Sequence, residues 1–78
     1  MTIDNMVDFE EHNSKELRTL SQQHDLNYLD VLVENIRMRG THLTAYCIKH
    51  QHIPDEQEEV VVYLDVLKTM KEQYNNGM

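Results

Sequence analysis

Apolar residues recur along most of the chain at spacings of three and four, the pattern of helices that bury one side. The pattern is clearest over residues 27–39, where Asn27 suits a helix N-cap. Arg37 and Arg39 suit a helix C-terminus, and Gly40 after them predicts a left-handed cap. We therefore expect this helix to end at Gly40. Its apolar positions, expected to face the core, are Leu29, Leu32, Val33 and Ile36, with Tyr28 and Val31 beside them.

A second helix is expected directly after Gly40. Thr41 can cap it, and it should end at Ile53 because the residue before Pro54 avoids the α conformation. The residues expected to share one side of this helix are Leu43, Tyr46, Cys47 and His50.

The last helix is expected over residues 55–76, where Asp55 and Glu58 fit a capping box and Gly77 belongs to a stop signal. Its apolar positions are Val60, Tyr63, Leu64, Leu67, Met70 and Tyr74. Because so long a helix should overhang a small domain, we expect part of its apolar side to pair with a second copy. The residues of this expected homodimer interface are Val60, Leu64, Leu67 and Tyr74.

The N-terminal part carries weaker signals. We expect a first helix over residues 14–24, in which only Leu17 and Leu20 mark an inner side. Residues 1–12 are predicted to be an acidic leader that frays, ahead of a single helical domain over residues 13–78.

Composition agrees with a helical fold. The chain has 78 residues, of which only 2 are Gly and 1 is Pro, so helix breakers are few. We expect an all-α bundle of three to four short helices with a long C-terminal helix. The single Cys excludes an internal disulfide, and no apolar run approaches the ~20 residues of a membrane span. The opening residues lack the pattern of a signal peptide, so we expect a cytoplasmic protein.

Charge is segregated along the chain. The net charge is −7, yet residues 35–54 contain no acid. The basic side chains of that segment are Arg37, Arg39 and Lys49. They either serve a helix end and solvation or form a positive patch that meets an acidic partner protein.

Side chains able to bind a metal or to act as a nucleophile are few. Cys47 and His50 lie three residues apart, and His42 and His52 lie nearby. Zinc requires three or four ligands in tetrahedral geometry, and His52 should point elsewhere. A Cys–His nucleophile needs an orienting group, which the sequence does not offer. We therefore expect no metal, no cofactor and no enzyme activity.

Two nucleic-acid hypotheses remain open. The helix–Gly40–helix pattern permits a helix-turn-helix that would bind DNA through residues 41–52. The net charge of −7 opposes such binding because it repels phosphate. The same acidity permits a different role, in which the protein mimics DNA and inhibits a nucleic-acid-binding protein.

One stretch resembles a known family. Ser14-Lys15-Glu16-Leu17, followed by residues 26–34 with the sequence Leu-Asn-Tyr-Leu-Asp-Val-Leu-Val-Glu, is similar to the late-transcription coactivators of large tailed phages. The resemblance continues through Gly40 and Leu43 and covers about 35 residues.

Members of that family are small helical proteins that bind the flap of the β subunit of the host RNA polymerase. The resemblance implies a transcription regulator encoded by a phage or bacterium that acts in the host cytoplasm. The family's tail for sliding-clamp binding has no counterpart in residues 74–78. The matching core residues are Tyr28, Leu29, Leu32, Val33 and Ile36, and then Leu43 and Tyr46. With the basic residues, the expected partner site is these seven plus Arg37, Arg39 and Lys49.

Overall fold

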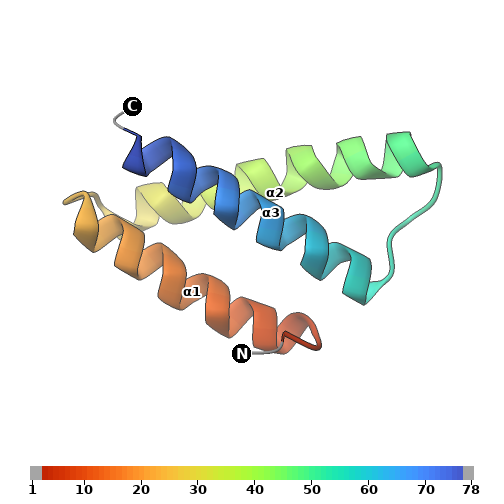
Figure 1. Ribbon diagram of the computed structural model, residues 1–78, viewed down its shortest axis with the longest axis horizontal. Helices are drawn as coiled ribbons and strands as arrows, with labels where there is room; N and C mark the ends of the chain where they lie inside the picture. The colour runs from red at the N-terminus through yellow and green to blue at the C-terminus, as the bar shows by residue number, and fades with distance from the viewer. Residues whose placement is uncertain (1–2, 77–78) are drawn as a thin grey trace.

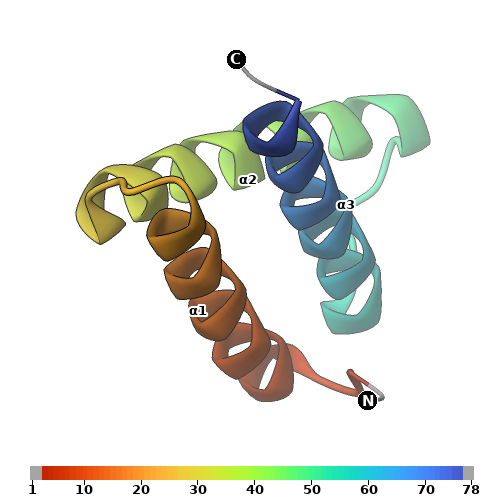
Figure 2. The ribbon, with the colours of Figure 1, turned by 60° about the vertical axis from the view of Figure 1, so that its left-hand side comes forward.

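The computed structural model describes residues 3–76, which form three α-helices and no strand (Figure 1). The helices are α1 (Met6–Gln23), α2 (Tyr28–His50) and α3 (Glu56–Asn75). α1 and α3 run in the same direction, and α2 runs the opposite way across both of them (Figures 1 and 2). The all-α prediction is therefore confirmed for the described residues. Residues 1–2 of the expected leader and Gly77 of the expected stop signal lie outside them.

Helix α1 begins earlier than the sequence pattern predicts. Asn5 caps it by accepting a hydrogen bond from the Asp8 backbone N–H at 3.0 Å, so the start expected at residue 14 is wrong. Asn13 and Phe9, one and two turns before Leu17, are both buried. The buried side of α1 includes the polar Asn13, so the spacing of apolar residues does not reveal the first half of this helix.

Helix α2 passes through Gly40 without interruption, so the cap expected there and the division into two helices are wrong. Glycine in a helix interior costs about 1 kcal/mol relative to alanine. Contacts of α2 with both neighbouring helices outweigh that cost. The left-handed residue that ends α2 is Gln51, with φ 57°. Because Gly40 is not a turn, residues 41–52 do not form the second helix of a helix-turn-helix.

Helix α3 agrees with its prediction. Asp55 accepts a hydrogen bond from the Glu58 backbone at 2.8 Å, and Glu58 accepts one from the Asp55 backbone at 3.1 Å, which completes the capping box. At 20 residues, α3 is shorter than α2 with 23, so the C-terminal helix is not the long one.

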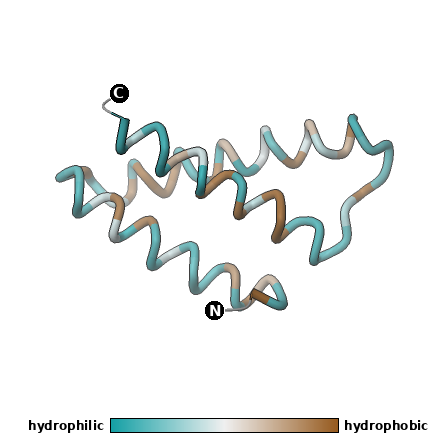
Figure 3. The backbone as a smooth tube through the Cα atoms, viewed as in Figure 1, coloured by the Kyte–Doolittle hydropathy of each residue, from teal (hydrophilic) through white to brown (hydrophobic). Residues whose placement is uncertain are grey.

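The core lies where the three helices meet, and Figure 3 shows apolar and polar residues interleaved along all of them. Within this core, Asn13 of α1 donates a hydrogen bond to Asn35 of α2 at 3.1 Å, and Asn35 lies 3.5 Å from the sulfur of Met70. None of the helices in the described residues is long and apolar enough to cross a membrane. The buried apolar residues are Phe9, Leu17, Leu20, Val31, Met38, Val60, Val62, Tyr63, Val66, Leu67 and Met70.

Candidate interaction surface

The side of α2 that faces away from the other helices is apolar. Leu29, Val33 and Ile36 expose 64%, 65% and 57% of their surface. They lie one turn apart along the same side, because their spacings are four and three residues. Figures 1 and 2 show that no neighbouring helix covers this side. We call it the outer face of α2. Its residues are the exposed Leu29, Val33, Ile36 and Gly40, followed by Leu43 and Cys47, which are half-buried.

Leu29, Val33 and Ile36 were expected in the core, and that prediction is wrong. The buried positions of α2 are instead Val31, Asn35 and Met38. Apolar residues occur around much of the circumference of α2, so the spacing of apolar residues was compatible with either of two sides of the helix facing the core. The buried face contains the polar Asn35, whose partner Asn13 lies 22 residues away in the sequence.

Tyr28, Leu32, Leu43 and Tyr46 lie at the border between the outer face and the core. All four are half-buried and pack against the core cluster. They therefore contribute to the stability of the fold while keeping part of their surface at the edge of the outer face.

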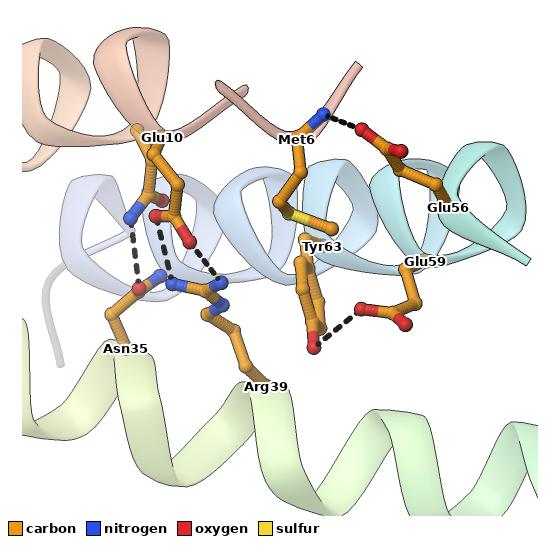
Figure 4. A network of polar contacts seen from close by, with 8 residues as sticks. Met6, Glu10, Asn35, Arg39, Glu56, Glu59 and Tyr63 are labelled. Carbon is orange, nitrogen blue, oxygen red and sulfur yellow. Dashed lines mark hydrogen bonds and ion pairs between the residues drawn. The ribbon is translucent and has the colours of Figure 1, made fainter. Parts of the chain in front are cut away.

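Arg39 is half-buried between the helices, and its charge is engaged within the chain. Its guanidinium binds both carboxylate oxygens of Glu10 on α1, at 2.7 and 3.2 Å, and only 16% of its side chain is exposed. It also lies 4.1 Å from the ring centre of Tyr63 on α3 and 5.2 Å from that of Phe9. Figure 4 shows this side chain among groups from all three helices. We therefore remove Arg39 from the expected partner site.

Arg37 is exposed next to the outer face and forms an ion pair with Glu34 one turn before it. Arg37 Nε donates a hydrogen bond to Glu34 Oε2 at 3.0 Å, and Nη2 donates to Oε1. This hydrogen bonding lowers the pKa of Glu34 and raises the pKa of Arg37. The positive charge expected there is thus neutralised locally.

An open cleft of about 360 Å³ lies between the C-terminal half of α2 and α3. Two residues of the expected partner site, Tyr46 and Lys49, line it; Tyr46 lies at the border of the outer face, and Lys49 does not lie on that face. The cleft is also lined by His42, His50, Val62 and Asp65. His50 stacks on Tyr46 with ring centres 4.1 Å apart, and His42 Nδ1 lies 3.5 Å from Asp65 Oδ2.

Glu58 joins the ends of α2 and α3 beside this cleft. It accepts hydrogen bonds from the Tyr46 hydroxyl, the Asp55 backbone and His52, the last at 3.0 Å. These bonds lower the pKa of Glu58 to about 2 and raise the pKa values of His52 and Tyr46. The arrangement is a structural clasp, since every hydrogen-bonding oxygen of Glu58 is engaged within the chain.

The residues expected to pair α3 with a second copy are mostly inside the protein. Val60 and Leu67 are 4% and 3% exposed and belong to the core, and Leu64 and Tyr74 are half-buried. An interface built on Val60 and Leu67 therefore does not fit the structure. The helix that projects is α2, whose last turns extend past α1 (Figure 1).

No group of three His, Cys, Asp or Glu side chains in residues 3–76 is placed to hold a metal ion. Comparison of the chain with protein-family models, with curated proteins and with solved structures finds no match. The exposed apolar side chains on the outer face of α2 are therefore the strongest lead to function.

Proposed function

We propose that this protein is a small acidic interaction module that regulates transcription by binding RNA polymerase through the outer face of α2. The observation that carries the proposal is the solvent exposure of Leu29, Val33 and Ile36 in one line. Burying an aliphatic side chain of this size against a partner contributes roughly 1.5–3 kcal/mol. Three of them on a rigid helix supply a preorganised binding surface.

The identity of the partner rests on the sequence resemblance. Leu29, Val33 and Ile36 match positions of the flap-binding core in the phage coactivators, and all three are exposed. Their exposure supports the proposal because residues that contact a partner must be reachable in the free protein. On this basis we propose a phage- or bacterium-encoded protein that acts in the host cytoplasm.

The proposal is tested with purified bacterial RNA polymerase core enzyme and the full chain. We expect retention at low micromolar concentration, and Val33→Glu should weaken it at least about tenfold. Val61→Glu is the matched control, since Val61 on α3 is 66% exposed and Val33 is 65% exposed. No retention of the natural chain, or equal loss in both variants, would contradict the proposal.

Salt dependence separates this function from DNA mimicry. Contacts through apolar side chains should change little between low and moderate salt. An acidic DNA mimic would instead bind with steep salt dependence and would compete with DNA.

A further inference from the structure

The outer face of α2 has the spacing of a coiled-coil seam. Its six residues follow one another at intervals of four, three, four, three and four. Hydrophobic positions that recur every 3.5 residues on average are the a and d positions of a heptad repeat. This spacing is suited to a second helix lying along α2, rather than to a globular surface of arbitrary shape.

The two middle positions of the seam are a large residue, Ile36, and a residue without a side chain, Gly40. Ile36 is 57% exposed, and a Cβ added to Gly40 would meet no atom within 4 Å. The six positions are symmetric about residue 38, so an antiparallel copy would place Ile36 opposite Gly40 twice. In the same register Val33 meets Leu43, and Leu29 meets Cys47. A knob opposite a hole is the packing that coiled coils use.

Charge favours the antiparallel direction. Asp30 lies in the first turn of α2 and Asp25 just before the helix, whereas Lys49 lies in its last turn. Antiparallel pairing places the acidic end of one α2 beside the end of the other that carries Lys49, and it opposes the two helix dipoles. Arg37 flanks the midpoint, where its ion pair with Glu34 neutralises the charge that it would bring near its own copy.

We propose that a second copy of this chain covers the outer face, with α2 packed antiparallel against α2 and Ile36 of each copy above Gly40 of the other. The dimer itself follows from the seam and the charge pattern. Its consequence, that polymerase and the second copy compete for one surface, rests on the proposed function. The homodimer thereby keeps three exposed aliphatic side chains out of water until the partner is present.

Sedimentation equilibrium of the full chain tests the dimer. At about 100 μM the natural chain should be dimeric, and Val33→Glu should raise the dissociation constant about 100-fold, because each dimer would bury two carboxylates. Val61→Glu should leave it unchanged. A monomeric natural chain would overturn the proposal, as would a dimer that survives Val33→Glu or that Val61→Glu also disrupts.

Cys47, the one cysteine of the chain, reports the direction of pairing. In the antiparallel register the two copies of Cys47 are about 27 Å apart along the helix axis, at 1.5 Å per residue. Mild oxidation should therefore leave the natural dimer uncrosslinked, whereas Leu29→Cys should give a covalent dimer. Rapid crosslinking of the natural chain, or none in a dimeric Leu29→Cys variant, would exclude this arrangement.

The two proposals fail in different ways. A dimer that does not bind polymerase would refute the proposed function and leave the dimer standing. A monomer that binds polymerase through Val33 would refute the dimer and leave the proposed function standing. If both hold, adding polymerase core enzyme should dissociate the dimer of the natural chain.

Discussion

Individual side chains with several partners hold the junctions of this small protein. Glu58 accepts hydrogen bonds from Tyr46, His52 and the backbone of Asp55, so one carboxylate closes the connection between α2 and α3. A carboxylate with this many donors strongly favours its charged form. The strength of the connection therefore depends on the protonation of Glu58 and of His52.

The pH dependence follows from the two pKa directions. The pKa of Glu58 falls from 4.5 to about 2 on folding, so its contribution to stability is present above pH 4.5 and is lost as pH falls from 4.5 toward 2. The pKa of His52 rises above 6.5, so its contribution is present below pH 6.5 and is lost as pH rises through the raised value. We expect Glu58→Gln to lower the urea midpoint most between pH 4.5 and 6.5.

Glutamine suits this test because its amide oxygen keeps the capping-box hydrogen bond to the Asp55 backbone. His52→Ala should abolish the loss of stability that occurs as pH rises above 6.5. The loss of stability below pH 4.5, which comes from Glu58, should remain. An equal difference between the natural chain and Glu58→Gln at pH 3 and at pH 5.5 would contradict the assigned role.

At the scale of elements, the unbroken helix α2 determines the architecture. Its first half packs against α1 and α3, and its second half meets α3 at the cleft. A break at Gly40 would have made four short helices and no continuous outer face. The continuity of α2 through Gly40 is thus the condition for both proposals.

Gly40→Ala tests that continuity. Because the new methyl group meets open space and the backbone is helical, we expect the free energy of unfolding to rise by about 0.5–1 kcal/mol. The urea midpoint should be measured at low protein concentration, so that dimerisation does not contribute. Ala45→Gly, at an exposed position of the same helix, should lower it by a similar amount. A lower midpoint in Gly40→Ala would mean that glycine is required there.

Local signals predicted some elements and failed for others. The capping box of Asp55 and Glu58 and the apolar period of α3 are written within a few residues, and both were predicted correctly. The face of α2 that is buried depends on Asn13, 22 residues away from Asn35. No local pattern contains that pairing, and a polar residue argues against burial. Leu29, Val33 and Ile36 were therefore expected to face inward, whereas the structure exposes them.

At the scale of the whole molecule, the fold is somewhat elongated. Its radius of gyration is 12.8 Å and its extents are 39 × 25 × 19 Å. A compact chain of this length would have a radius of about 11.5 Å. The long axis accommodates α2, which at 1.5 Å per residue is about 35 Å long. Because so small a domain buries little apolar surface, the three helices need specific polar contacts with one another as well as apolar burial.

Arg39 is the joint that all three helices share. Arg39→Ala removes the paired hydrogen bonds to Glu10 and the contact with Tyr63, so we expect the free energy of unfolding to fall by about 2 kcal/mol. Arg37→Ala removes an exposed ion pair and should leave the urea midpoint unchanged. Similar midpoints for the two variants would show that Arg39 does not join the helices.

The amide pair of Asn13 and Asn35 selects between two ways of seating α2. Rolling that helix by about half a turn would hide Leu29, Val33 and Ile36, and it would strand Asn13 in a dry interior without its partner. The hydrogen bond between the two amides therefore fixes which side of α2 faces the core. The solvent exposure of Leu29, Val33 and Ile36 thus depends on two buried amides, neither of which reaches the surface.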